Sequence, residues 1–290
     1  LRGKGAVDVV AGNQSLKHLP DLLREHRTNH RRVLDVHPHE DVSFPLGAIK
    51  RSDPVRAWVT IIEGCNELCS FCVVPYTRGH ERMRPVSAIL DEVHRAVGAG
   101  RSEIQLLGQI VNHYQAPDDA ACRFADLVER VSRVPGVRRV RFASPHPRHV
   151  DSRLLEVMRD VPVVCKHLHL PVHSGSNEVL RRMRRRYTRE LYLDLVAEAR
   201  ETVPGVTIST DMIVGFPGES PQDFDETCSL VEAVRFHSMY SFKYSPRPNT
   251  LAAKRFADDV TEGEKTRRIV ALQGLQRTIL EAQAMERPVV

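Results

Sequence analysis

The chain has 290 residues, of which 41% are hydrophobic, and Lys plus Arg exceed Asp plus Glu by five (42 − 37). This length can bury a substantial core, and no apolar run approaches the roughly 18 residues that cross a bilayer. We expect a cytoplasmic protein, because there is no leader-like segment and the six cysteines are not spaced like a secreted disulfide framework.

Residues 1–50 contain too little apolar material for an independent core. The pattern predicts a strand over 7–10, a short helix over 15–23 and a second strand over 33–36. Because the chain opens on Leu1 rather than Met, we expect residues 1–50 to be an incomplete unit cut from a longer protein.

From residue 51 to 260 the pattern is a regular alternation of strands and helices. The expected strands are 57–62, 104–107, 137–143, 167–172, 206–214 and 238–244. Between them we expect helices over 87–98, 124–134, 152–161, 177–186, 189–203 and 222–236. Ser87 is expected to cap the first of these helices, and Gly98 and Gly100 to end it. The terminal segment 261–290 contains a last helix, 262–286.

Six strands alternating with helices predict an α/β fold, with a parallel sheet curved into a partial, six-stranded barrel. In such folds the chemistry gathers at the carboxyl ends of the strands. Polar or glycine-rich segments follow five of the expected strands, at 63–72, 108–109, 144–147, 173–176 and 215–219. We therefore expect one site on this rim.

Three cysteines, Cys65, Cys69 and Cys72, follow the first of these strands with C-x3-C-x2-C spacing. A closed tetrahedral metal site needs four ligands and a disulfide needs two cysteines, so three thiolates fit neither. They suit a cubane iron–sulfur cluster that keeps one iron free for a substrate. A zinc site that adds His80 is the alternative, although it gives the other four rim loops no role.

The cysteine motif, with Phe71 before its last cysteine, resembles that of the radical S-adenosylmethionine superfamily. The stretch Pro75-Tyr76-Thr77-Arg78-Gly79 with Glu81 narrows the resemblance to the methylthiotransferase branch. Agreement continues over nearly all of residues 55–285, through 144–147, 169–172, 174–177, 211–219 and 244–248. Within the branch, residues 76–81 and 108–112 favour the members that act on dimethylallyladenosine in tRNA.

The resemblance implies a [4Fe–4S] cluster on Cys65, Cys69 and Cys72, with S-adenosylmethionine chelated to the fourth iron and cleaved to a 5′-deoxyadenosyl radical. It implies methylthiolation at C2 of N6-(dimethylallyl)adenosine at position 37, in the anticodon stem-loop of tRNA. A reductant such as flavodoxin or ferredoxin and a monomeric state are further expectations. Residues 9–23 are similar to the end of the family's amino-terminal domain, so the resemblance implies that residues 1–50 are the remnant of this α/β domain and its linker. A second [4Fe–4S] cluster and an RNA-binding β-domain are expected only in a longer chain.

The resemblance also implies that the rim loops hold S-adenosylmethionine. The candidate cofactor-binding residues are Gly108, Gln109, Ser144, Ser174, Gly215, Gly218 and Glu219. Backbone at 108–109 would approach the methionine moiety, and the glycines of 215–218 would let backbone approach the adenine. The alternative for each glycine segment is a plain turn, and for the two serines a helix cap. No catalytic residue is assigned.

Four residues depart from the family pattern. Ile110 stands in place of Asn, His173 in place of Gln, and Arg186 and Asn249 each in place of Gly. Because Ile110 and His173 lie on the expected rim, two other substrates stay open, threonylcarbamoyladenosine in tRNA and a ribosomal protein. The alternative of a different class is a non-catalytic iron–sulfur or zinc module that binds RNA.

Overall fold

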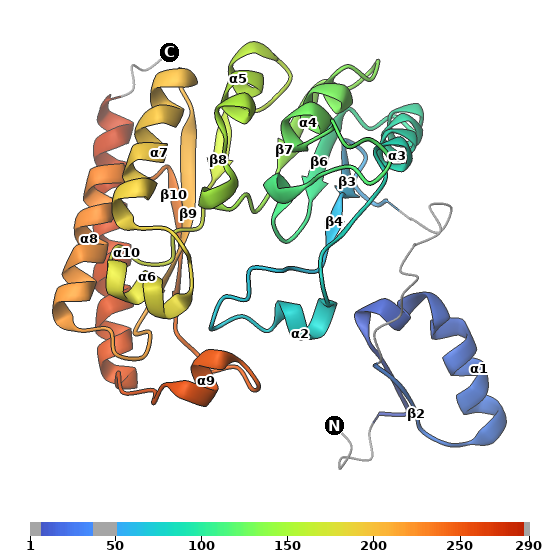
Figure 1. The fold of residues 1–290 in the computed structure, drawn as a ribbon, viewed down its shortest axis with the longest axis horizontal. Helices are drawn as coiled ribbons and strands as arrows, with labels where there is room; N and C mark the ends of the chain where they lie inside the picture. The colour runs from blue at the N-terminus through green and yellow to red at the C-terminus, as the bar shows by residue number, and fades with distance from the viewer. Residues whose placement is uncertain (1–6, 37–50, 287–290) are drawn as a thin grey trace.

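The computed structural model describes residues 7–36 and 51–286. In the first range, β1 (Val9–Ala11) and β2 (Val33–Asp35) form a parallel pair, connected by the 3-10 helix η1 (Asn13–His18) and by α1 (Leu19–Asn29) (Figure 1). The helix expected over 15–23 therefore starts as a 3-10 turn and runs further than expected. Residues 37–50, which the sequence places in the linker, lie outside the described residues.

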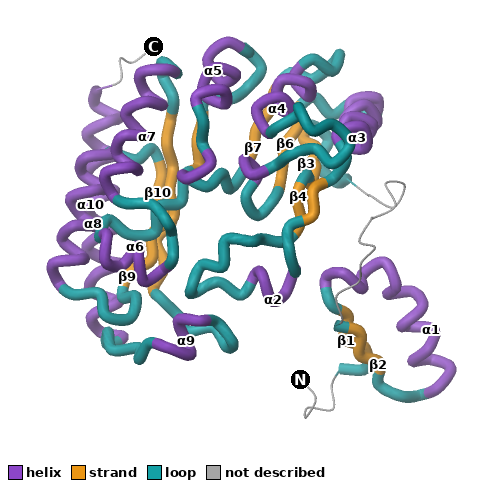
Figure 2. Tube along the Cα trace, in the orientation of Figure 1, coloured by secondary structure: helices purple, strands orange, loops and turns teal. Residues whose placement is uncertain are grey.

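Six parallel strands form the core of the second range. In one sheet, β6 (Glu103–Leu107) lies between β3 (Arg56–Thr60) and β7 (Arg139–Phe142). In the other, β9 (Thr207–Val214) lies between β8 (His167–His169) and β10 (Ser238–Lys243). A parallel bridge between Val140 and Val164 joins the two sheets. The strands follow one another in an open curve (Figures 1 and 2), which confirms the predicted partial barrel.

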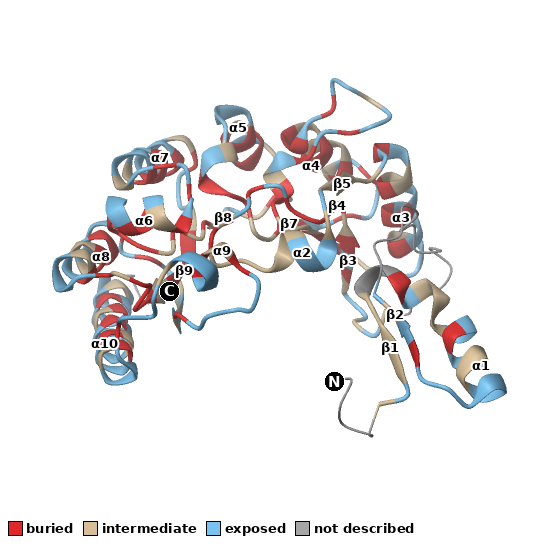
Figure 3. Ribbon diagram, turned by 60° about the horizontal axis from the view of Figure 1, so that its bottom comes forward, coloured by how far each residue is buried: buried red, intermediate tan, exposed pale blue. Residues whose placement is uncertain are grey.

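Helices cover the outer face of this curve, with their buried sides toward the strands (Figure 3). They are α3 (Val86–Gly98), α4 (Phe124–Ser132), α5 (Ser152–Asp160), α6 (Asn177–Met183), α7 (Arg189–Thr202), α8 (Pro221–Val234) and α10 (Glu262–Glu286). The outward strand residues, such as Val59, Ile104 and Val140, are fully buried beneath them. Since α10 packs against β10 and α8, the last helix belongs to this outer layer.

Short elements follow the strands at the rim. They are β4 (Ile62–Glu63), α2 (Val74–Arg78), β5 (Arg82–Met83), η3 (Val111–His113), η4 (Pro147–His149) and α9 (Leu251–Arg255). β4 and β5 pair in the antiparallel direction and frame the cysteine segment. The rim therefore carries most of the irregular structure, as the sequence predicts.

The start of α3 differs from the sequence prediction. Its N-cap residue is Pro85, which has no side chain able to accept a hydrogen bond. Asp118 takes that role instead, because its carboxylate accepts from the backbone N–H of Val86 (2.7 Å) and of Ser87 (3.1 Å). The prediction that Ser87 caps the helix was wrong, while the end of the helix at Gly98 is confirmed.

None of the helices in residues 7–36 and 51–286 combines the length and the apolar character that a membrane crossing requires.

Candidate functional site

The cysteine loop, residues 64–72, leaves β4 and folds back on residues 79–80. Gly64 has φ +75°, and a Cβ there would lie 2.1 Å from the carbonyl oxygen of His80, so only glycine fits. The N–H of Cys65 donates to the carbonyl of Gly79 (3.2 Å), and that of Cys72 donates to the carbonyl of Cys69 (3.1 Å). All three cysteines are free, so one short loop offers three thiols.

The donor chemistry of this loop fits a cationic iron–sulfur cluster. Burial raises the pKa of Cys65 to about 11 and raises that of Cys72 as well. Both thiols are therefore protonated until a cation compensates the thiolates, which is how metal binding couples to proton release. Among the residues that the structure describes, no three His, Cys, Asp or Glu side chains are grouped to hold a single metal ion.

Two glutamate–histidine contacts brace the loop from the side of β6 and β7. The buried Glu67 lies 2.9 Å from Nε2 of His149, a hydrogen bond that lowers the pKa of Glu67 to about 2. Glu81 lies 2.6 Å from Nδ1 of His113. The two histidine rings stack with centroids 4.5 Å apart. The loop is thus tied to η3 and η4, a connection that the sequence analysis missed.

Ser70 ties the same loop to the other half of the barrel. It is fully buried, and its N–H donates to the carbonyl of Met183 (3.0 Å). Its hydroxyl donates to the carbonyl of Arg182 (2.7 Å), and its own carbonyl accepts from the N–H of Ala252 (2.7 Å). The cysteines are therefore held between α6 and α9 on one side and η3 and η4 on the other.

Gly108, Gln109 and Ser144 lie at the rim as predicted. A Cβ on Gly108 would lie 3.2 Å from the Cβ of Ile62, so glycine allows the end of β6 to approach the segment that leads into the cysteine loop. Gln109 follows it and is half-buried. Ser144 directly follows the carboxyl end of β7 with φ +61°. Because parallel strands end at one edge, the structure brings these residues to the side of the cysteines.

The hydroxyl of Ser174 is engaged inside the protein. This fully buried residue lies with its Oγ 3.3 Å from Oγ1 of Thr227 on α8, and it accepts from the N–H of Ser176 (3.2 Å). Ser176 in turn caps α6 by accepting from the N–H of Val179. Ser176 is therefore the residue that caps α6, and Ser174 supports that cap without capping the helix itself.

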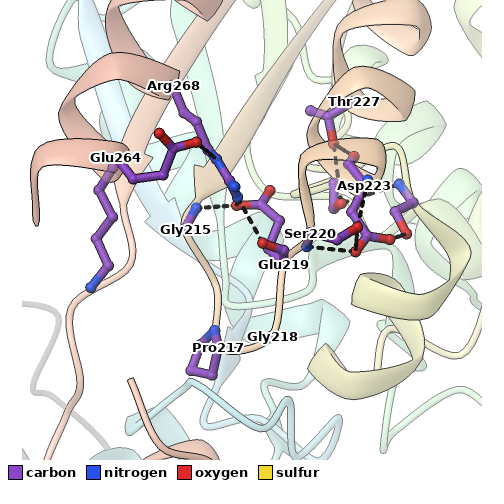
Figure 4. A network of polar contacts seen from close by, with 12 residues as sticks. Gly215, Pro217, Gly218, Glu219, Ser220, Asp223, Thr227, Glu264 and Arg268 are labelled. Atoms are coloured by element: carbon purple, nitrogen blue, oxygen red, sulfur yellow. Dashed lines mark hydrogen bonds and ion pairs between the residues drawn. The ribbon is translucent and has the colours of Figure 1, made fainter. Parts of the chain in front are cut away.

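The loop after β9 is shaped by a buried ion pair (Figure 4). Glu219 accepts from the N–H of Gly215 and from the guanidinium of Arg268 on α10 (2.8 Å). Arg268 also donates to the carbonyl of Glu219 (2.9 Å) and to Glu264 (2.7 Å). Gly215 and Gly218 have φ +71° and +75°, which fits their glycines. Oε2 of Glu219 is thus part of the loop's own structure, whereas Oε1 is buried and has no hydrogen-bond partner within the described residues.

Two imidazoles near the cysteines, of the buried His146 and the half-buried His173, each have a buried nitrogen that makes no hydrogen bond within the described residues. These atoms are Nε2 of His146 and Nδ1 of His173. Burial lowers the pKa of His146 to about 2 and that of His173 well below its ordinary value, so both rings are neutral. His173 meets the ring of Phe71 edge-on, with centroids 5.2 Å apart. Such orphaned polar atoms indicate that a ligand completes the site.

The lumen of the partial barrel is polar and hollow. A cavity of about 300 Å³ lies among the inward-facing strand residues, including Gln105, Arg141, His167, His169, Ser209 and Tyr240. Closed barrels of this kind are filled by branched aliphatic side chains instead. The polar lining of the lumen was not predicted, although the strict alternation of polar and apolar residues in 167–169 and 207–211 indicates it.

Comparison with known proteins identifies the superfamily. The family model described as "Radical SAM superfamily" matches residues 59–231. The tRNA-2-methylthio-N(6)-dimethylallyladenosine synthase of Desulforamulus reducens is 44% identical over 94% of this chain and 59% of its own length. The protein of the same name from Solibacter usitatus is 42% identical over 94% of this chain and 61% of its own length. The chain thus spans about three fifths of these relatives.

Solved structures show the same fold at low identity. Coproporphyrinogen III oxidase of Escherichia coli, a radical SAM enzyme, has a TM-score of 0.57 at 17% identity and covers 78% of this chain and 53% of its own. The radical S-adenosylmethionine methyltransferase of Kitasatospora setae, solved with cobalamin and a [4Fe–4S] cluster, has a TM-score of 0.56 at 17% identity over 68% of this chain and 38% of its own. With its three-cysteine loop on the rim of a partial barrel, this chain belongs to the radical SAM superfamily.

Proposed function

We propose that this chain is the radical-generating core of a methylthiotransferase that acts at C2 of dimethylallyladenosine beside the anticodon of tRNA. The observation that carries the proposal is the set of three free thiols on one loop, at the carboxyl end of a six-stranded partial barrel. The relatives of 42% to 44% identity, which are named for this reaction, support the substrate.

In this proposal Cys65, Cys69 and Cys72 hold a [4Fe–4S] cluster. Together with S-adenosylmethionine, that cluster supplies a radical able to attack an aromatic C–H bond that acid–base chemistry leaves untouched. The chain positions both partners. Backbone at Gly108 and Gln109, Ser144, and the glycines at 215 and 218 line the cofactor. Ser174 shapes its loop rather than touching the cofactor, because its hydroxyl already has protein partners. Glu219 stays in the proposed cofactor site, since Arg268 holds only one of its carboxylate oxygens, and the other, Oε1, is buried without a hydrogen-bond partner within the described residues.

The proposal includes an organisation of the chain and its partners. Residues 1–50 end an amino-terminal domain, residues 51–260 form the radical core, and residues 261–290 contain the last helix. The tRNA partner is an anticodon stem-loop, the electron donor is a flavodoxin or a ferredoxin, and the protein is a monomer. Size-exclusion chromatography with light scattering tests the monomeric state.

Anaerobic reconstitution tests the core of the proposal. We expect about four irons per Cys65–Cys72 site, with broad visible absorption. With S-adenosylmethionine and dithionite the protein should release methionine and 5′-deoxyadenosine, and the Cys69→Ala variant should release neither. Stoichiometric zinc in place of iron would contradict the proposal.

A deletion strain tests the substrate. Mass spectrometry of its tRNA should show dimethylallyladenosine without the methylthio group, and the plasmid-borne gene should restore that group. Loss of a methylthio group from threonylcarbamoyladenosine or from a ribosomal protein would instead select one of the two alternative substrates.

A further inference from the structure

Arg185 is buried directly beneath the cysteine loop. Its exposed fraction is 5%, and its Nη1 lies 3.6 Å from Sγ of Cys69. Nη2 donates to the carbonyl of Pro171 (2.8 Å), and Nε donates to the hydroxyl of Tyr187 (3.0 Å). The guanidinium also lies 5.2 Å from the centre of the Tyr187 ring. Each nitrogen is therefore directed by the protein, and one of them points at a cysteine sulfur.

The charge of this group has no carboxylate counter-ion among the residues that the structure describes. No Asp or Glu within residues 7–36 and 51–286 forms an ion pair with Arg185. Its partners are a carbonyl, a phenol and a thiol, and the neighbouring His146 and His173 are neutral. A buried guanidinium stays charged and is costly without an anion. An anion that is not a side-chain carboxylate must therefore compensate it.

The backbone around Arg185 is strained in a way that fixes its position. Arg184 and Arg186, on either side of it, both have left-handed φ values, of 59° and 58°. The N–H of Arg185 donates to the carbonyl of Leu180 (3.0 Å), which closes the turn at the end of α6. Two left-handed arginines that flank one buried side chain are uncommon, and such strain gathers at functional sites.

We propose that Arg185 is a positioning residue for the cluster, a fixed positive charge that holds the Cys69 thiolate and makes the cluster easier to reduce. The inference rests on the cluster of the proposed function. Three thiolates give such a cluster a net negative charge, which grows by one when an electron enters. A nearby cation therefore stabilises the reduced form more than the oxidised form, and hydrogen bonds to the sulfurs act in the same direction.

The test compares charge with hydrogen bonding in the full chain reconstituted with iron and sulfide. Arg185→Lys keeps the charge, Arg185→Gln keeps a donor but loses the charge, and Tyr187→Phe is the matched control that leaves the charge untouched. Iron content and an electron-paramagnetic-resonance redox titration are measured, and the relevant signal is the one that Cys69→Ala removes. We expect parent, Lys and Phe forms to titrate together and the Gln form to titrate at a more negative potential.

Each outcome decides the matter. A Gln form that loses iron while the Lys form keeps it also supports the proposal, because the charge then secures the cluster itself. A fully loaded Gln form that titrates with the parent overturns it, and so does equal loss of iron from the Lys and Gln forms. If the parent chain binds no cluster, the proposed function fails, and the role of Arg185 at that cluster fails with it.

Discussion

Two rim loops of the same barrel are each held by a buried arginine, and the two arginines have opposite surroundings. Arg268, which holds the loop after β9, faces the carboxylates of Glu219 and Glu264 at 2.8 and 2.7 Å. Arg185, under the cysteine loop, faces a carbonyl, a phenol and the sulfur of Cys69. Both are nearly inaccessible, with exposed fractions of 3% and 5%.

The two arginines therefore have different roles. Arg268 belongs to a structural ion pair, whereas the charge of Arg185 is not compensated by a carboxylate of the described residues. Arg268 and Glu219 neutralise each other, so the charges that shape this loop are paired within the protein. Arg185 carries an uncompensated charge beside three thiols, so its loop is complete only with an added anion. Burial alone does not distinguish the two roles, whereas the identity of the partners does.

The largest effect should come from breaking the compensated pair. Arg268→Met leaves the buried Glu219 carboxylate without its partner, and we expect a loss of about 3–5 kcal/mol in the free energy of unfolding. Urea denaturation followed by circular dichroism measures it. Adding Glu219→Gln should recover part of the loss, because the stranded charge is then removed. A loss as small as that of a surface substitution would contradict the pairing.

Acid should weaken the cysteine side of the molecule through its neutral histidines. The pKa of His173 in the folded protein lies well below the ordinary value of 6.5. Below pH 6.5 the His173 side chain therefore binds a proton in the unfolded chain but stays neutral in the folded chain. Stability is therefore fully present above pH 6.5 and falls as the pH drops, by up to about 1.4 kcal/mol per pH unit for this group.

In the His173→Gln variant the free energy of unfolding should depend less on pH, by the contribution of one bound proton. Urea denaturation at about pH 7.5 and about pH 5.5 measures the difference. Equal slopes in the parent and the His173→Gln variant would show that His173 is protonated in the folded protein.

A smaller effect is expected at Arg185 in the absence of iron. Arg185→Gln removes a buried charge that has no counter-ion and loses about one hydrogen bond's worth of stability, so the net change should stay within about 1 kcal/mol. The same urea series measures it. If Arg185→Gln lowered the free energy of unfolding as much as Arg268→Met does, Arg185 would have an anionic partner in the protein. The two arginines would then not differ in how their charges are compensated.

The smallest effect concerns the turn that places Arg185. Arg186 has φ 58°, where glycine has no steric penalty, so Arg186→Gly should raise the free energy of unfolding by at most about 1 kcal/mol. Arg181→Gly, inside α6, is the opposite control and should cost about 1 kcal/mol. Thermal denaturation of the two variants against the parent measures both changes.

The fold followed from the sequence because its signals are local. The apolar runs that form β3, β6 and β9 and the amphipathic stretches between them need only a few neighbours to be recognised. The end of α3 was predicted for the same reason. Its start was not, because the carboxylate that caps it lies 31 residues from Ser87.

The same distinction between local signals and distant contacts applies to the site. Sequence spacing is sufficient to single out Cys65, Cys69 and Cys72, since all three lie in one loop. The partner of Glu219 is 49 residues away on α10, so sequence alone could not place this side chain in an ion pair. The departures Arg186 and Asn249 are explained by left-handed backbone (φ 58° and 69°), where a glycine would be unstrained. Asn tolerates this conformation better than Arg does.

Ser70 gives the cysteine loop a late place in the order of folding. Its hydroxyl bonds to a carbonyl 112 residues further along the chain, so the loop cannot close until the second half of the barrel has formed. Contacts of such sequence separation are slow to form, because the chain entropy of a long loop must be lost first. Until then the three thiols stay exposed to oxidants, and iron loading competes with the oxidation of nascent chains.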